Sequence, residues 1–142
     1  MTFASVTEIS QRLDIHEPFL MLDEIDTMVP HKRAHGKKRL TKEDWYFRSH
    51  LPSIGAMPAT LVAESMLQVM AFLINSNNEC LGKAIVSKIN INMLRAVQSG
   101  DELDIEVTQH WQRERQVKGS GRVCVGKTLV CTGAFLYSVV SN

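Results

Sequence analysis

An almost uninterrupted apolar stretch from Ala59 to Ile74 constrains the fold of this chain more than any other feature of the sequence. Pro58 comes directly before it, and the fixed φ of proline suits the first turn of a helix. A helix that is apolar nearly all round is a buried helix. This one is too short and too polar to span a bilayer, which needs about 20 predominantly apolar residues. The stretch therefore predicts a central helix that the rest of the chain encloses.

Three polar residues interrupt this helix at a spacing of four, so that Thr60, Glu64 and Gln68 share one face. A carboxylate on a buried helix is costly unless it has a partner or a task. His50 lies upstream, before a loop interrupted by proline and glycine, and it follows an aromatic cluster at residues 45–47 that predicts a hydrophobic plug under the loop. The pair formed by His50 and Glu64 is our candidate for chemistry.

Length and composition predict one globular domain over residues 1–142 and exclude several classes of function. The net charge of +1 gives no strong attraction to nucleic acid or to a membrane surface. The three cysteines lack the spacing of metal ligands, so we interpret them as reduced thiols of a cytoplasmic protein, and no signal peptide is expected. His31 and His35 are four residues apart, but the cationic side chains around them disfavour a metal. We expect neither a metal nor a cofactor.

The remaining periodicity predicts an α+β fold in which a curved antiparallel sheet wraps around one helix. A lead-in helix is expected within residues 2–13, and a strand is expected to follow Pro18. The basic stretch at residues 30–39 is interpreted as a solvated hairpin connection, and residues 75–79 as a polar break after the central helix. Alternating apolar residues predict four further strands, at residues 84–93, 102–111, 117–125 and 128–139.

Three blocks of this sequence, PFLMLD (18–23), FRSHLPSIGAMPATLVAESMLQ (47–68) and SGDEL (99–103), resemble successive blocks of one family. They are similar to the β-hydroxyacyl-acyl-carrier-protein dehydratases of fatty-acid synthesis, which have the hotdog fold. The signature of that family is a His-Phe-Pro loop, then Met-Pro-Gly at the start of a helix that carries Glu and Gln. The positions in register here are His50, Pro52, Met57, Pro58, Leu61, Glu64, Met66 and Gln68.

The chain departs from the family pattern mainly in the glycine-rich frame around the dyad. The glycine before the histidine is Ser49, the phenylalanine after it is Leu51, and the glycine after Met-Pro is Ala59. Ser53 and Gly55 stand where the family has a loop glycine and proline. The pattern is that of a specialised relative with its dyad intact.

Dehydration of a 3-hydroxyacyl thioester requires groups of the types found here. A base must remove the weakly acidic C2 proton, and histidine has a pKa near working pH, so we assign this role to His50. The leaving hydroxide needs a proton, and a carboxyl in an apolar setting stays protonated, so we assign this role to Glu64. The free amides at the start of the central helix can stabilise the thioester oxygen, and Ala59 is the first candidate because Pro58 has no N–H.

The resemblance implies several further features of the protein. It implies a homodimer, with a trimer of dimers left open, in which His50 of one subunit faces Glu64 of the other. It places Gln68 beside the dyad as an orienting residue and Met57 in the substrate-binding region. It implies acyl carrier protein as the partner that presents the acyl chain, which would lie in an apolar tunnel. Candidate tunnel residues are Met66, Met70 and Met93.

Two other functions stay open on the sequence. A hotdog acyl thioesterase would use Glu64 to activate water, although such enzymes seldom pair that carboxylate with a histidine in this loop. A non-catalytic acyl-binding or assembly subunit would keep the fold and lose turnover, and the altered glycines leave room for that reading. The dehydratase is the hypothesis that uses both His50 and Glu64.

Overall fold

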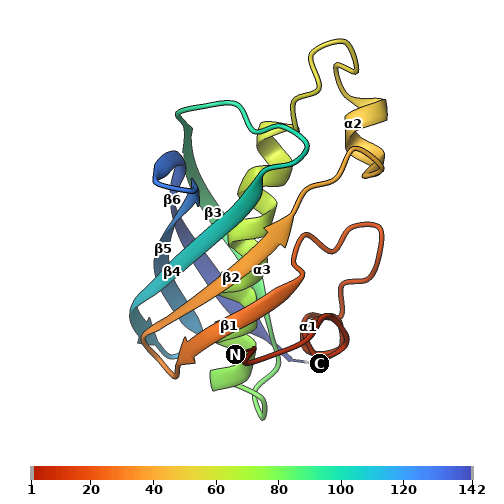
Figure 1. The fold of residues 1–142 in the computed structure, drawn as a ribbon. Helices are drawn as coiled ribbons and strands as arrows, with labels where there is room; N and C mark the ends of the chain where they lie inside the picture. Colours follow the sequence, from red (N-terminus) through yellow and green to blue (C-terminus); the bar gives the residue numbers. More distant parts are fainter. Residues whose placement is uncertain (1, 142) are drawn as a thin grey trace.

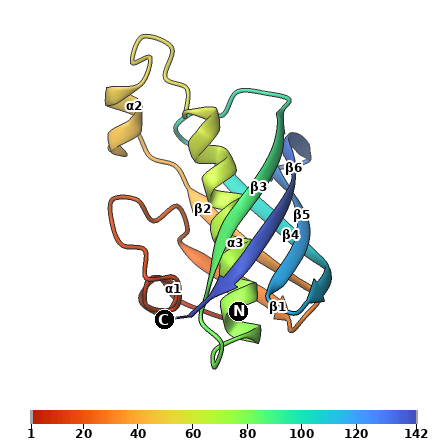
Figure 2. The ribbon, with the colours of Figure 1, turned by 180° about the vertical axis from the view of Figure 1, so that it is seen from behind.

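The computed structural model describes residues 2–141 and consists of one curved sheet around one long helix. The sheet has the strand order β1-β2-β4-β5-β6-β3, and all neighbouring strands are antiparallel. Figures 1 and 2 show the sheet bending around α3, with α1 beside the lower end of α3 and α2 projecting beyond its upper end. The predicted α+β architecture is confirmed. The elements are α1 (Val6–Leu13), β1 (Glu24–Val29), β2 (Arg33–Arg39), α2 (Trp45–Ser49), α3 (Ala59–Asn77), β3 (Lys83–Met93), β4 (Glu102–Arg113), β5 (Gln116–Val125) and β6 (Thr128–Val140).

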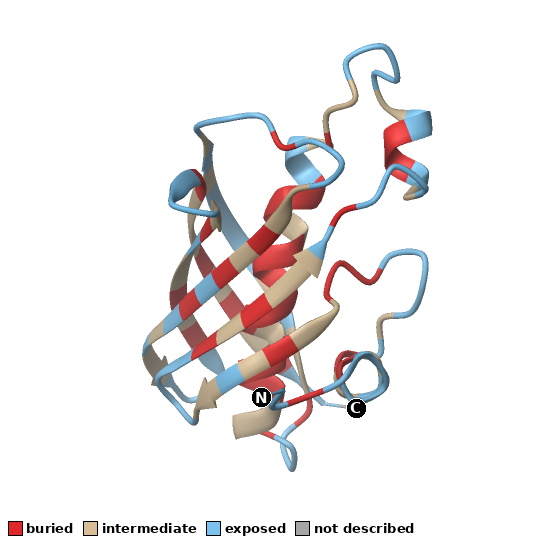
Figure 3. Ribbon diagram, in the orientation of Figure 1, coloured by how far each residue is buried: buried red, intermediate tan, exposed pale blue. Residues whose placement is uncertain are grey.

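The helix α3 is buried because it is apolar on nearly every side. Contrary to the expectation from the sequence, its length and composition alone would allow it to cross a membrane. However, 72% of its most apolar window is buried inside the protein, as in a core helix. Glycines of the sheet let it approach closely. A Cβ added to Gly119 would lie 2.6 Å from Met70, and one added to Gly121 would lie 2.8 Å from Met66. The two methionines therefore fill the space that these glycines leave open. Figure 3 shows buried residues along most of α3 and at alternating positions of the strands that pack on it.

The strand β2 corrects one sequence prediction. We expected residues 30–39 to form a solvated connection, but Arg33–Arg39 pairs with both β1 and β4. Its inward positions are the small residues Ala34 and Gly36, and a Cβ added to Gly36 would lie 2.9 Å from Val69 of α3. The strand is thus buried because α3 packs closely against its backbone, and it needs no large apolar side chains. Its sequence therefore shows no strong alternation of apolar residues.

The outward face of β2 carries a histidine that is paired with carboxylates. One ring nitrogen of His35 contacts Asp26 of β1, and the other lies 3.1 Å from Asp104 of β4. His31 is in the preceding turn, where its backbone N–H donates to Asn77. Across residues 2–141 no group of three or more histidine, cysteine or acidic side chains is arranged to hold a metal ion.

The end of α3 differs from the predicted polar break. The helix continues to Asn77, and Asn75 and Asn78 are both buried. The side-chain oxygen of Asn75 accepts a hydrogen bond from the N–H of Ala84 at 2.7 Å, and its amide donates to the carbonyl of Arg12 at 3.1 Å. Asn75 therefore joins α3 to the start of β3 and to the end of α1.

The other predicted elements agree with the structure within a few residues. The four later strands are confirmed as β3 to β6, and the lead-in helix is confirmed as α1. The segment after Pro18 is different, because β1 begins only at Glu24. Leu20, Met21 and Leu22 are buried in an irregular segment that precedes the strand. Their apolar side chains pack in the core, although their backbone does not pair with a strand of the sheet.

Candidate active site

The polar stripe on α3 centres on a half-buried carboxylate that a buried amide holds in place. Gln68 is only 1% exposed, and its Nε2 donates a hydrogen bond to Oε2 of Glu64 at 2.9 Å. Burial raises the pKa of Glu64, while the hydrogen bond from Gln68 acts in the opposite direction, and the net shift is upward. A carboxyl with a raised pKa holds its proton nearer to neutral pH, which suits a general acid.

Glu64 lines a mainly apolar pocket between the start of α3 and the edge strand β3. The pocket has a volume of about 500 Å³ and opens to solvent. Glu64 and Thr60 are its only polar side chains, and they come from the same face of α3 one turn apart. Such a lining suits an apolar chain that carries a small polar group at one position. The residues of the wall are Ala59, Thr60, Ala63, Glu64, Leu67, Ile89, Ile91 and Met93.

The start of α3 adds hydrogen-bond donors to this pocket. The carbonyl of Pro58 already accepts from Leu61 and Val62, so Ala59 and Thr60 carry the amides that precede the intrahelical ladder. Both residues line the pocket, and a helix start attracts developing negative charge. Met57 lies elsewhere, because it is buried and its N–H donates to the carbonyl of Val97 at 2.8 Å.

His50 ends the short helix α2, at the beginning of the loop that leads to α3. Its backbone N–H donates to the carbonyl of Tyr46, and its Nδ1 lies 3.2 Å from the carbonyl oxygen of Ala56. A carbonyl oxygen can only accept, so this contact needs the proton on Nδ1. In the neutral tautomer with this proton, the lone pair is on the other ring nitrogen, Nε2, which can then act as a base. Leu51, the next residue, has a φ of +45° and starts the turn that continues the loop.

Within one chain the structure does not bring His50 and Glu64 together. The pocket beside Glu64 is lined by α3 and β3 residues, and His50 is not among them. Across residues 2–141 the two side chains make no hydrogen bond or ion pair with each other. Figures 1 and 2 show α2 and the loop after it reaching away from the body of the fold. Of the predicted residues, Glu64, Gln68 and Ala59 lie together on α3, and His50 lies apart.

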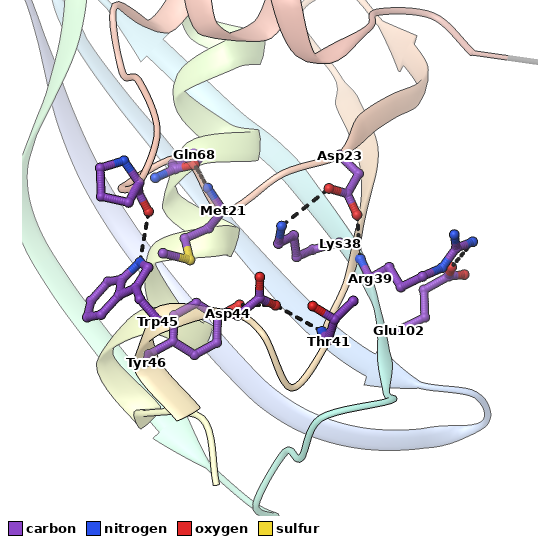
Figure 4. Close-up of polar contacts among 11 residues, drawn as sticks. Met21, Asp23, Lys38, Arg39, Thr41, Asp44, Trp45, Tyr46, Gln68 and Glu102 are labelled. Carbon is purple, nitrogen blue, oxygen red and sulfur yellow. Dashed lines mark hydrogen bonds and ion pairs between the residues drawn. The ribbon is translucent and has the colours of Figure 1, made fainter. Parts of the chain in front are cut away.

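Sequence reasoning missed the contacts between Gln68 and the segment that precedes β1. The N–H of Met21 donates to Oε1 of Gln68 at 2.8 Å, and Nε2 of Gln68 also donates to the carbonyl of Phe19 at 3.0 Å. Figure 4 shows Met21 beside Gln68, with Trp45 and Tyr46 nearby. These contacts join a side chain to the backbone of a segment more than forty residues away, and no local pattern signals them.

Only one of the three methionines proposed for an acyl tunnel lines the pocket. Met93 is in its wall, next to Ile91 of the same strand. Met66 and Met70 are both 0% exposed and pack on the glycines of β5 and β6. The reason is geometric, because these two side chains leave α3 on the face toward the centre of the sheet. They belong to the core, and the tunnel prediction is wrong for them.

Comparison with known protein families and curated relatives gives matches along nearly the whole chain. Residues 15–134 match the family described as FabA-like domain. A 3-hydroxyacyl-[acyl-carrier-protein] dehydratase FabZ of Clostridioides difficile is 32% identical over 142 residues, covering 97% of this chain and 99% of the relative. A protein of the same description from Herpetosiphon aurantiacus is 31% identical over 138 residues, covering 96% of this chain and 98% of the relative.

Solved structures show the fold. The dehydratase heterocomplex ApeI:P from Xenorhabdus doucetiae contains a chain with a TM-score of 0.78 and 16% identity, covering 94% of this chain and 91% of that one. A hot-dog-like protein from Thermanaerovibrio acidaminovorans has a TM-score of 0.67 and 17% identity, covering 78% and 82%. The expected hotdog fold is confirmed by these likenesses.

Proposed function

This chain belongs to the FabA-like domain family of FabZ-type dehydratases, and from that premise we propose that it removes water from 3-hydroxyacyl groups carried on acyl carrier protein. The product is the trans-2-enoyl thioester, and the reaction serves fatty-acid or related polyketide synthesis. The observation that carries the proposal is Glu64, a carboxyl of raised pKa in an apolar pocket at the start of a buried helix. Full-length similarity to proteins of that description supports the reaction.

The first step is removal of the C2 proton by His50. With Nδ1 turned to the carbonyl of Ala56, its Nε2 has a free lone pair for this proton. The electron pair left at C2 moves toward the thioester carbonyl, so negative charge grows on that oxygen. The amides of Ala59 and Thr60 supply hydrogen bonds where this charge develops, and the helix dipole adds to them.

The second step is departure of the 3-hydroxyl group as water. Glu64 donates its proton to the leaving oxygen while the C2–C3 double bond forms from the electron pair at C2. Burial raises the pKa of this carboxyl, so it holds its proton to a higher pH than a free carboxyl does. The hydrogen bond from Gln68 then stabilises the carboxylate that results. Proton transfer from His50 to Glu64, directly or through water, restores the starting state.

We infer that the working unit is a homodimer in which His50 of one chain meets Glu64 of the other. The separation of the two groups within one chain supports this arrangement. The edge strand β3 supports it too, because among the described residues one side of it has no partner strand, and it carries Ile85 and Ile89 at 56% and 47% exposure. An edge with exposed apolar residues is a template for pairing with a second copy.

The partner is acyl carrier protein, whose acidic surface needs basic side chains near the pocket. Arg48 on α2 and Arg95 after β3 are exposed and belong to segments at the end of the molecule where α3 starts. Arg113 and Arg115 belong to the β4–β5 hairpin at the opposite end, where the Arg115 guanidinium donates to the carbonyls of Leu81 and Val139. Arg48 and Arg95 are therefore the basic residues we assign to docking.

We also infer a soluble enzyme of the cytoplasm. The burial of α3 inside the sheet supports solubility. The cysteines Cys80, Cys124 and Cys131 are free, as thiols are in a reducing compartment.

Incubation with carrier-bound thioesters tests the function. The whole protein is mixed with a 3-hydroxyacyl and, separately, a trans-2-enoyl thioester of acyl carrier protein, and the near-ultraviolet absorbance of the conjugated enoyl group is followed. We expect interconversion to the same equilibrium from both sides. Release of free acid would replace the proposal with a thioesterase, and absence of any conversion would replace it with an acyl-binding subunit.

A further inference from the structure

The irregular segment from Pro18 to Met21 contacts both helices that carry the proposed catalytic pair. On one side, Nε1 of Trp45, the first residue of α2, donates to the carbonyl of Pro18 at 3.1 Å. On the other side, the carbonyl of Phe19 and the N–H of Met21 bond to the side chain of Gln68 on α3. Figure 4 shows Trp45 and Gln68 on either side of this segment. Three hydrogen bonds thus connect α2 to α3 through four residues.

On the α3 side, the segment sets the orientation of the amide beside Glu64. Gln68 is 1% exposed, and each of its polar atoms has a partner. The oxygen accepts from Met21, so the Nε2 group must be the one turned toward Phe19 and Glu64. A shift of the segment would turn or pull this amide, and the hydrogen bond to Glu64 would lengthen with it.

On the α2 side, the segment contacts the first residue of the helix. α2 has five residues, and His50 caps its C-terminal end. Tyr46 and Phe47 are buried, which fixes one face of the helix. Trp45 is 38% exposed, so most of its ring is covered, and its side-chain hydrogen bond is the one to Pro18. That bond restrains rotation of α2 about its buried face, and His50 rotates with α2.

We propose that Pro18–Met21 is a brace that fixes the His50 helix against the Gln68–Glu64 pair, and that Trp45 is a positioning residue for the reaction. The proposal rests on the function proposed above. In the inferred dimer, His50 and Glu64 of one chain serve different sites. One brace therefore positions one catalytic group in each of the two sites, and loosening it in one chain disturbs both.

Trp45→Phe tests the brace because it keeps the aromatic ring and removes the donor. Trp111→Phe is the matched control, since the chain has two tryptophans and Trp111 lies on β4, stacked with Arg113 at 4.7 Å. We expect Trp45→Phe to lower kcat about 3- to 10-fold, the range open to one hydrogen bond of ordinary net strength. KM for the carrier-bound substrate should stay unchanged, and Trp111→Phe should change neither constant.

A second measurement reads the brace without any turnover. Hydrogen exchange of the Met21 amide, followed by NMR, should speed up in Trp45→Phe and stay at the wild-type rate in Trp111→Phe. A reciprocal variant uses Trp45 as the only indole: in the Trp111→Phe background, Gln68→Met should shift the Trp45 fluorescence emission. Neither readout depends on turnover, so both test the brace even if the wild-type protein catalyses no dehydration. That result would overturn the proposed function and leave the brace to be tested.

The proposal is overturned if Trp45→Phe matches Trp111→Phe in kcat and in Met21 exchange. It is also overturned if kcat falls while Met21 exchange and Trp45 emission stay unchanged, because Trp45 would then act on His50 without the segment. A fall in kcat together with faster Met21 exchange supports it.

Discussion

The two halves of the proposed catalytic pair are held in contrasting ways. Glu64 sits on a 19-residue helix in the core, with the buried Gln68 bonded to it and to the backbone of a distant segment. His50 sits at the end of a five-residue helix, and its loop continues with Leu51 and Ile54 at 50% and 63% exposure. This loop therefore presents two large apolar side chains to solvent, three residues apart.

This contrast indicates which half of the site one chain completes by itself. The Glu64 half has its pocket, its helix-start amides and its orienting amide in place. His50 does not line that pocket, and the loop after it presents the apolar side chains of Leu51 and Ile54 outward. The simplest account is that the His50 loop of each chain covers the Glu64 pocket of another. The predictions below test this division.

The largest effect is expected where both halves meet the substrate. His50→Ala and Glu64→Gln should each lower kcat by at least about 100-fold, the low end for general acid–base catalysis. Matched controls are His110→Ala and Glu106→Gln, which alter exposed residues of β4 on the outer face of the sheet. Steady-state assays with the carrier-bound substrate give the answer, and full activity in either site variant would end its assignment.

The next effect separates core from pocket on the Glu64 side. Met66→Ala should lower the free energy of unfolding by about 2–5 kcal/mol, because a fully buried side chain is replaced by a cavity. Met93→Ala should cost less stability and instead change the preference among acyl chain lengths, since Met93 lines the pocket. Denaturant melts and KM values for short and long acyl groups distinguish them. If Met66→Ala alone changed the chain-length preference, Met66 would line the acyl tunnel, as the sequence first suggested.

A smaller effect is expected at the orienting amide. Gln68→Met keeps the volume but leaves the buried N–H of Met21 unpaired, which costs about 1–3 kcal/mol, and it also removes the donor to the part-buried carbonyl of Phe19. Glu64 also loses its donor, so its pKa should rise further and kcat should fall. Urea unfolding and the pH dependence of kcat measure the two parts. Unchanged stability would mean that water replaces the amide.

The smallest effect concerns stability and pH at Glu64. Burial raises its pKa in the folded state, so the folded chain binds this proton more tightly than the unfolded chain. The resulting stabilisation is full below the unfolded pKa and is lost as the pH rises through the folded pKa. At neutral pH, Glu64→Gln should therefore gain stability, by less than about 1 kcal/mol because the pocket is open to water. The gain should vanish in acid, as thermal melts across pH would record.

Much of the Glu64 half was predictable from sequence. The apolar run of α3, its four-residue polar spacing and the alternation in β4 are local patterns with direct structural meaning. β2 escaped prediction because its inward residues are Ala34 and Gly36, whose burial depends on the approach of α3. The bonds of Gln68 to the 18–21 segment escaped because they join backbone and side chain across a long stretch of sequence.

For the His50 half, the sequence predicted only the identity of the histidine, and it did so through the family resemblance. Periodicity carries no information on which chain a loop histidine faces, and the projecting position of α2 is visible only in three dimensions. The aromatic cluster at residues 45–47 was expected to be a plug. Tyr46 and Phe47 are buried as a plug would be, but Trp45 is turned toward Pro18 and partly exposed.

Subunit mixing tests the central claim most directly. His50→Ala and Glu64→Gln proteins, each inactive alone, are unfolded together, refolded at equal concentration and assayed. If His50 of one chain works with Glu64 of the other, activity should return to about a quarter of the wild-type rate, because about half of the dimers are mixed and each holds one intact site. If activity stays at the level of the separate variants while mixed dimers form, the two groups work within one chain and the account is contradicted.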